Sequence, residues 1–244
     1  MKTALCFAGT GRSIEYTFDN LRSKIIDDLK NNTKHCDIFV YITDTPKAEI
    51  AKKYFEPITE YIDIVKEDFT DPHGSGFVFE SDWPPSTRHH PEGYEKGRDI
   101  YLKMVRSRKH LVTMMDNTNV KYERVIFSRM DVAYQDGIFS KIQPLNMDFL
   151  WLPSFHHWKG GYNDRFAISN LFYMKTYLSQ WDYMNQYKNE GFVFQAERAL
   201  KNHLHRFGIT PKIFRYNFKR IRPDGKEHET WDQVENREAM PCDI

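Results

Sequence analysis

The first half of the chain alternates between two patterns of hydrophobic and polar positions. Short apolar runs typical of buried strands occupy 3–9, 36–43 and 61–67. Between them, over 13–30 and 47–58, apolar residues recur every three or four positions, which is the spacing of an amphipathic helix. This order of strand, helix, strand, helix and strand predicts a parallel sheet with right-handed crossovers.

The second half continues the pattern less regularly. A long helix is predicted over 98–117, and it leads into a fourth strand within the apolar run 125–134. Further candidates are a strand over 149–155, a helix over 194–208 and a strand over 212–221. With 244 residues the chain fits one α/β domain, and we expect a mostly parallel central sheet flanked by helices.

Composition narrows the class of protein. Thirty-five basic and 34 acidic side chains nearly cancel, which argues against a nucleic-acid partner, because such binding needs clustered positive charge. No apolar run approaches the ~20 residues that a membrane-spanning helix needs, so we expect no such helix. Three scattered cysteines without a C-x-x-C pair predict a soluble protein of a reducing compartment, the cytoplasm.

Polar residues stand at three predicted strand ends, where an open parallel sheet binds its ligands. The stretch "GTGRS" (9–13) follows the first strand, Thr43 and Asp44 end the second, and Arg129 and Asp131 interrupt the fourth. "GTGRS" lacks the third glycine of a dinucleotide-binding loop and the lysine of a P-loop. An ordinary turn between strand and helix therefore stays an alternative for this stretch, as a capping or turn role does for Asp44.

Arg129 and Asp131 need an explanation because they interrupt an apolar segment. An unpaired buried charge costs roughly 2–5 kcal/mol, so each must have a partner. The pair is either a structural ion pair or the end of a strand that presents a carboxylate to a metal or a phosphate. Arg129 can also neutralise a phosphate without any metal.

Two further carboxylates are candidates in the second half. Asp164 follows the glycine pair 160–161, which suggests a flexible loop placing this carboxylate at the entrance of a helix. The alternative for Asp164 is a plain helix N-cap. Glu197 falls within a predicted helix, where the alternative is an ordinary solvated glutamate.

The order of several short motifs resembles a known family. They are "ALCFAGTGRS" (4–13), "CDIFVYITD" (36–44), "KYERVIFSRMDVAY" (121–134), "GGYNDRFAIS" (160–169) and "AERALKNHL" (196–204). In this order they resemble small GT-A-type glycosyltransferases of large DNA viruses, chloroviruses among them, and of bacterial polysaccharide clusters. The likeness spans nearly the whole chain, and it rests on the order of the motifs.

The resemblance implies a GT-A-like, Rossmann-type sandwich that forms a single glycosyltransferase domain over 1–244. Its nucleotide-binding half would be 1–134 and its acceptor-side half 135–244. The implied reaction moves a hexosyl or deoxyhexosyl group from a nucleotide-diphosphate sugar, with a UDP-sugar favoured, to a glycan or glycoprotein acceptor. For a viral protein the implied compartment is the host cytoplasm.

A divalent cation, Mn²⁺ or Mg²⁺, is also implied, held by a D-x-D-like motif after the fourth strand. This chain departs from that motif, because Arg129 takes the first acidic position. Of the two acidic positions in the motif, this chain keeps only the second, Asp131, as an implied metal or diphosphate ligand. A strict requirement for metal is therefore an open question.

The resemblance implies further roles for the candidate residues. The nucleotide would be contacted by Gly9, Thr10, Gly11 and Arg12, and its base or ribose by Thr43 and Asp44. Asp164 would face the acceptor hydroxyl or the donor sugar, with Glu197 nearby. A Pro- and Gly-rich segment, 70–97, is the candidate acceptor wall through Trp83, His89, His90 and Tyr94, with His156, His157 and Trp158 beside it.

Two other functions stay open. Loss of the first acid in the D-x-D pattern suggests a catalytically inactive module of the same fold that binds a nucleotide or a carbohydrate. A nucleotidyltransferase is the third hypothesis, although "GTGRS" offers only Arg12 where such enzymes use a lysine for the triphosphate.

Overall fold

The computed structural model describes residues 1–43, 45–65, 78–79, 91–157, 160–191, 193–227 and 229–231. For 78–79, 91–100 and 193–194 only the backbone is described. Asp44, Trp83, His89, His90 and Trp158 lie outside the described residues.

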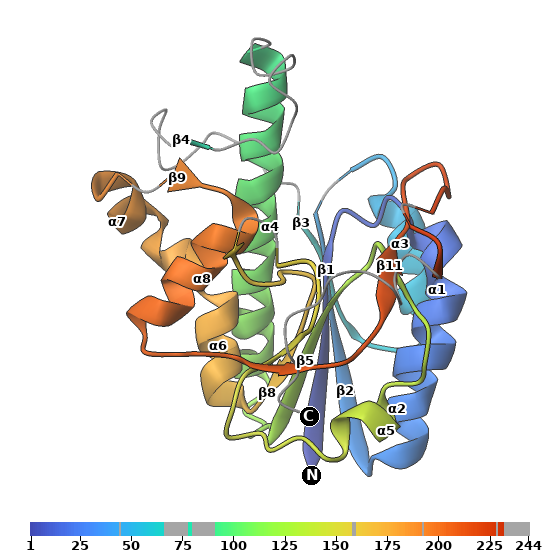
Figure 1. Ribbon diagram of the computed structural model, residues 1–244. Coiled ribbons are helices and arrows are strands. Elements are labelled where there is room, and N and C mark those ends of the chain that lie inside the picture. The colour runs from blue at the N-terminus through green and yellow to red at the C-terminus, as the bar shows by residue number, and fades with distance from the viewer. Residues whose placement is uncertain are drawn as a thin grey trace.

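A central sheet runs through the molecule (Figure 1). Among the described residues it has seven strands in the order β10 (Lys212–Phe214), β7 (Trp151–Pro153), β8 (Phe166–Ser169), β5 (Arg124–Arg129), β1 (Lys2–Gly9), β2 (His35–Thr43) and β3 (Tyr61–Val65). β1 pairs in parallel with both β2 and β5, whereas β8 is antiparallel to its neighbours β5 and β7. The predicted α/β fold with a mostly parallel sheet is confirmed.

Helices cover both faces of this sheet (Figure 1). One face carries α1 (Ile14–Leu21), the π-helical turn η1 (Arg22–Ile26), α2 (Asp27–Asn32) and α3 (Ala48–Phe55). The other carries α4 (Pro91–Asn117), α6 (Leu171–Leu178) and α8 (Ala196–Arg206). Because successive strand residues point to opposite faces, Leu5 and Phe7 of β1 join the first core, and Cys6 and Ala8 join the second.

Smaller elements complete the described chain. They are the antiparallel pair β6 (Val132–Tyr134) and β11 (Phe218–Arg220), the parallel pair β4 (Val78–Phe79) and β9 (Val193–Phe194), and the short helices α5 (Phe139–Ile142), η3 (Gln180–Tyr183) and α7 (Met184–Asn189). The β6–β11 pair lies directly after β5, and the backbone N–H of Ile221 donates to the carbonyl of Asp131 at 2.9 Å. This pair therefore fixes the chain at the carboxyl end of β5.

Two predicted elements were wrong. The predicted strand 212–221 is two strands, since β10 joins the central sheet and β11 pairs with β6. Part of the predicted irregular segment 70–97 is helical, because α4 begins at Pro91, a residue favoured in the first turn of a helix. Within the described residues, no helix is long and apolar enough to cross a membrane.

Candidate functional site

A pocket lies beyond the carboxyl ends of β1, β2 and β5. The space between its walls is about 710 Å³, which includes open solvent at its mouth. Its walls come from 8–13, from Thr43, from 129–131 and from the inner side of α4. The structure thus brings together seven of the predicted donor-site residues, namely Gly9, Thr10, Gly11, Arg12, Thr43, Arg129 and Asp131. Their binding roles stay predictions.

The loop after β1 has a defined shape. Gly11 has a φ of +63°, and a Cβ atom there would lie 2.5 Å from the Cβ of Ala51 on α3. Only glycine combines this backbone conformation with such a close approach. Thr45 Oγ1 donates to the carbonyl of Thr10 at 2.9 Å, which holds the loop from the other side. Arg12 is half-buried and makes no hydrogen bond or ion pair with the protein as far as it is described.

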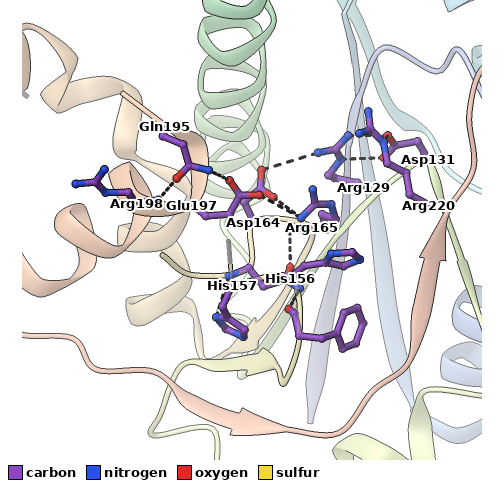
Figure 2. Close-up of polar contacts among 12 residues, drawn as sticks. Arg129, Asp131, His156, His157, Asp164, Arg165, Gln195, Glu197, Arg198 and Arg220 are labelled. Atoms are coloured by element: carbon purple, nitrogen blue, oxygen red, sulfur yellow. Dashed lines mark hydrogen bonds and ion pairs between the residues drawn. The ribbon is translucent and has the colours of Figure 1, made fainter. Parts of the chain in front are cut away.

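Arg129 and Asp131 form a two-point ion pair at the end of β5 (Figure 2). Arg129 Nε lies 2.8 Å from Asp131 Oδ1, and Nη2 lies 2.6 Å from Oδ2. Arg220 Nε from β11 adds a third hydrogen bond to Oδ2, at 3.1 Å. The ion-pair interpretation is therefore confirmed. The pair also lines the pocket, and its role toward a metal or a phosphate stays a prediction.

The ionisation of Asp131 follows from these contacts. Burial raises the pKa of Asp131, but the charges of Arg129 and Arg220 and the Arg129 hydrogen bonds outweigh it and hold the pKa well below its usual range. Burial and neighbouring guanidinium groups lower the pKa of Arg220 to about 10. At neutral pH Asp131 is a charged acceptor and a poor base.

Asp164 lies in the loop before β8, so the predicted helix entrance and the N-cap alternative are both wrong. The segment after it is a strand because "FAIS" pairs with β5, and helix α6 is capped by Asn170 instead. Asp164 is 1% exposed and lies among guanidinium groups of three residues. Figure 2 shows two of them, those of Arg129 and Arg165. The nitrogen–oxygen distances are 3.2 Å to Arg108, 3.3 Å to Arg165 and 3.9 Å to Arg129.

Glu197 is buried on the first turn of α8, so the alternative of a solvated glutamate is wrong. Its Oε1 lies 3.3 Å from Arg165 Nη1, and Gln195 Nε2 donates to its Oε2. Gln195 also caps α8, because its Oε1 accepts from the backbone N–H of Arg198 at 2.9 Å. Asp164 and Glu197 thus share Arg165, and neither lines the pocket (Figure 2).

Burial raises the pKa of Asp164, but the charges of Arg165, Arg108 and Arg129 reverse this effect and lower the pKa. Burial lowers the pKa of Arg129, yet the charges of Asp131 and Asp164 raise it overall. The arginines and carboxylates therefore stabilise each other in their charged forms. They form one connected network at the carboxyl ends of β1 and β5.

Arg108 on α4 is a pocket residue that the sequence analysis missed. Its side chain is 1% exposed, and its guanidinium lies 5.2 Å from the ring centre of Phe127 and 5.5 Å from that of Tyr177. Nη2 donates to the carboxylate and the backbone carbonyl of Asp164. Nε and Nη1 are buried and have no hydrogen-bond partner among the described residues.

A signal for Arg108 was present in the sequence. The buried positions of α4 recur every three or four residues at Tyr101, Val105, Arg108, Val112 and Met115. A charged residue on the apolar stripe of a helix is rarely buried without a partner or a ligand. Arg220 also lies in a basic stretch of the sequence, 214–226, but its partner Asp131 could not be inferred without the β6–β11 pairing.

The pocket has an excess of positive charge. Among the described residues, four cationic side chains line it (Arg12, Lys103, Arg108 and Arg129), against one carboxylate (Asp131). A cleft lined mainly by one sign of charge attracts ligands of the opposite sign. Arginine forks also match the geometry of phosphate oxygens.

The described residues do not fit a divalent cation. No group of three His, Cys, Asp or Glu side chains among them could hold a metal ion. Both oxygens of Asp131, the predicted metal ligand, are hydrogen-bonded to arginines. Hard cations such as Mn²⁺ and Mg²⁺ need several oxygen ligands, and the predicted metal site at Asp131 does not match this geometry.

The predicted acceptor wall is only partly described. His157 Nε2 lies 2.6 Å from the carbonyl of Pro153, and Nδ1 accepts from the backbone N–H of Asn163 at 3.3 Å. His156 pairs with Glu229 at 3.4 Å. Neither histidine lines the pocket. Tyr94 lies on α4, where only the backbone is described.

Comparisons with known proteins find similarity among solved structures. No family model matches the chain, and no curated protein matches it. Among solved structures, the chain is similar to the apo-form glycosyltransferase GlyE of Streptococcus pneumoniae TIGR4, with 13% sequence identity and a TM-score of 0.42. The match covers 85% of this chain and 43% of that one, so this chain spans less than half of that protein's length.

Proposed function

We propose that this chain is a glycosyltransferase that uses a nucleotide-diphosphate sugar. The observation that carries the proposal is the positively charged pocket at the carboxyl ends of β1, β2 and β5. That is where an open parallel sheet places its ligand. The residues that line it belong to 1–134, the half predicted to bind the nucleotide.

Each part of the pocket has a role in this proposal. The loop 9–13 and Arg12 contact the diphosphate, and Thr43 approaches the ribose or the base. Arg129 lies beside the leaving phosphate and stabilises the negative charge that develops there. The order of motifs along the chain supports these roles, together with the convergence of the loop and strand ends on one pocket.

The reaction would proceed by displacement at the anomeric carbon of the sugar. The bond from this carbon to the diphosphate oxygen breaks, and its electron pair leaves with the nucleoside diphosphate. An acceptor hydroxyl oxygen forms the new glycosidic bond, and its proton passes to an oxygen of the departing diphosphate. A UDP-sugar is the favoured donor, a hexosyl or deoxyhexosyl unit the favoured group, and a glycan or glycoprotein the acceptor.

Asp164 and Glu197 act as positioning residues in this proposal. Both are buried and face Arg165, and Asp164 also contacts Arg108 and Arg129. The guanidinium groups around Asp164 lower its pKa, which makes it a poor general base. The role of the two carboxylates is to hold the arginines beside the pocket.

Thermal unfolding with donor compounds tests the proposal. UDP-, GDP- and dTDP-sugars are added in turn, each far above its dissociation constant. A ligand at 100 times its dissociation constant adds about 2.7 kcal/mol of stability. We therefore expect the sugars of one of these three nucleotides to raise the Tm clearly. Release of the nucleoside diphosphate with an acceptor glycan then demonstrates transfer. If no nucleotide sugar raises the Tm, the donor site is refuted.

A binding module without catalysis is the second candidate. It is favoured by one observation, that Asp131, Asp164 and Glu197 are all hydrogen-bonded or paired to other side chains. Such a module would raise its Tm with a nucleotide sugar but would never turn it over. Slow hydrolysis of a bound donor to free sugar and nucleoside diphosphate excludes it.

A further inference from the structure

We propose that arginine side chains take the place of a divalent cation at this site, so that the diphosphate is bound without metal. Arg12, Arg108 and Arg129 are the residues that supply the positive charge. The inference rests on the proposed function, because it specifies how that donor site holds its diphosphate. It also identifies Arg108, which no motif in the sequence marked, as a binding residue.

The first argument concerns the charges around Asp131 and Asp164. Within the described part of the chain, four guanidinium groups (Arg108, Arg129, Arg165 and Arg220) contact three carboxylates (Asp131, Asp164 and Glu197), so these side chains have one positive charge in excess. A dication beside it would be repelled by these groups and would have to displace an arginine from Asp131. The network is therefore complete without a metal.

The second argument is the unused hydrogen-bonding capacity of Arg108. Nε and Nη1 of this buried side chain have no acceptor among the described residues, although Arg108 lines the pocket. A buried donor without a partner is unfavourable and is uncommon in folded proteins. Phosphate oxygens are the acceptors that a guanidinium fork binds best.

The third argument is the arrangement of Arg12 and Arg129 in the same pocket. Two nitrogens of Arg129 are used by Asp131, while Nη1 lies 3.9 Å from Asp164, beyond hydrogen-bond distance. Arg12 follows Gly11 on the loop and has no partner among the residues described. A diphosphate in the pocket would thus meet guanidinium groups from the loop, from β5 and from α4.

Calorimetric titration with UDP, GDP, dTDP and inorganic pyrophosphate tests the inference. Each probe is titrated into the purified chain in excess EDTA and again with Mn²⁺ or Mg²⁺. We expect at least one nucleoside diphosphate to bind with dissociation constants that agree within about threefold between the two buffers, which is under 1 kcal/mol.

Two outcomes would contradict it in different ways. Binding that weakens about tenfold or more in EDTA, a difference of 1.4 kcal/mol, overturns the metal-free inference and leaves the donor site standing. Failure of every nucleoside diphosphate to bind in both buffers overturns the inference together with the proposed function.

Variants assign the binding to the arginines. Arg12→Ala removes a loop side chain without an internal partner, and Arg108→Lys keeps the charge but removes the fork. We expect each to weaken binding of UDP or of the best nucleoside diphosphate about tenfold in EDTA. Arg22→Ala is the control, because Arg22 is an exposed side chain paired with Asp27 outside the pocket. An Arg12→Ala variant with affinity within twofold of the control overturns the inference, even if Arg108→Lys fails to fold.

Discussion

Gly161 packs against the backbone of Glu197 so closely that a Cβ atom at 161 would lie 2.2 Å from the Glu197 carbonyl carbon. The next residue, Tyr162, donates its backbone N–H to the carbonyl of Glu197 at 2.9 Å. The loop before β8 is thus fixed to the first turn of α8. This contact keeps Asp164 and Glu197 on the same arginine, Arg165.

Gly161→Ala should therefore destabilise the protein by about 2 kcal/mol or more, because the added methyl group collides with backbone that cannot move aside. Gly160→Ala is the matched control. Its Cβ would meet nothing within 4 Å, but Gly160 has a φ of +70°, so only a backbone penalty of about 1 kcal/mol is expected. Urea unfolding of both variants gives the comparison. Equal losses of stability in the two variants would show that the close approach at Gly161 adds no penalty of its own.

Asp131→Asn should lower the free energy of unfolding by about 3 kcal/mol, because it removes the half-buried carboxylate that pairs with both Arg129 and Arg220. Asp27→Asn removes an exposed carboxylate paired with Arg22 and should change stability by less than 1 kcal/mol. Denaturant unfolding at neutral pH measures both. A loss at Asp131 no larger than at Asp27 would mean that the network contributes little to the fold.

Asp164→Asn separates the positioning role from a role as base toward the acceptor hydroxyl, which the resemblance implied that Asp164 would face. As a positioning residue it should destabilise the fold by about 3 kcal/mol and weaken donor binding, so that the KM for donor rises. As a general base it should instead lower kcat about 10²-fold or more, with donor affinity unchanged. Steady-state kinetics and unfolding are measured together. Glu197→Gln serves as comparison, because it removes the other charge on Arg165 without touching Arg108.

His203 on α8 should make stability depend on pH. Burial lowers the pKa of His203 to about 4, and its ring lies 2.8 Å from the carbonyl of Thr176 and 2.5 Å from the hydroxyl of Tyr187. The ring is neutral in the fold, with Nε2–H donating to Thr176, whereas the unfolded chain protonates near pH 6.5. Stability is therefore full above pH 6.5 and declines by up to about 3 kcal/mol as pH falls toward 4.

Unfolding curves between pH 4 and 7 for the wild type and for His203→Gln test this expectation. The substituted chain lacks the titrating ring, so its stability should fall less over the same interval. Carboxylates such as Asp131 contribute equally to the pH dependence of both proteins, so their contribution cancels when the two are subtracted. Identical slopes in the two proteins would exclude His203 as the source.

The sequence predicted the first half of the fold well because its elements are local. β1, β2 and β3 are apolar runs between amphipathic helices, and each signal lies within one segment. β8 was not predicted as a strand, since "FAIS" is short and its pairing with β5 is decided by contacts far along the chain. The same holds for β11, whose separation from β10 depends on its pairing with β6.

The candidate site was likewise predicted only in part. The residues that follow β1, β2 and β5 converge as expected, because parallel strands end at one edge of the sheet. Arg108 and Arg165 were missed, since one comes from the middle of α4 and the other from a loop that only the fold brings to Glu197. The contacts of Asp164 and Glu197 with arginines could not be inferred from the sequence, and the acceptor-side role of these carboxylates stays a prediction.

The position of β1 between β2 and β5 also determines when the sheet can be completed during synthesis. Thr3 pairs with Arg124, so 121 residues separate two neighbours in the ladder. Until β5 leaves the ribosome, one edge of the apolar strand β1 has no partner, and such edges are prone to pair with other chains. Contacts of this sequence separation also slow folding. The pocket, whose walls include the ends of both strands, can form only after this late pairing.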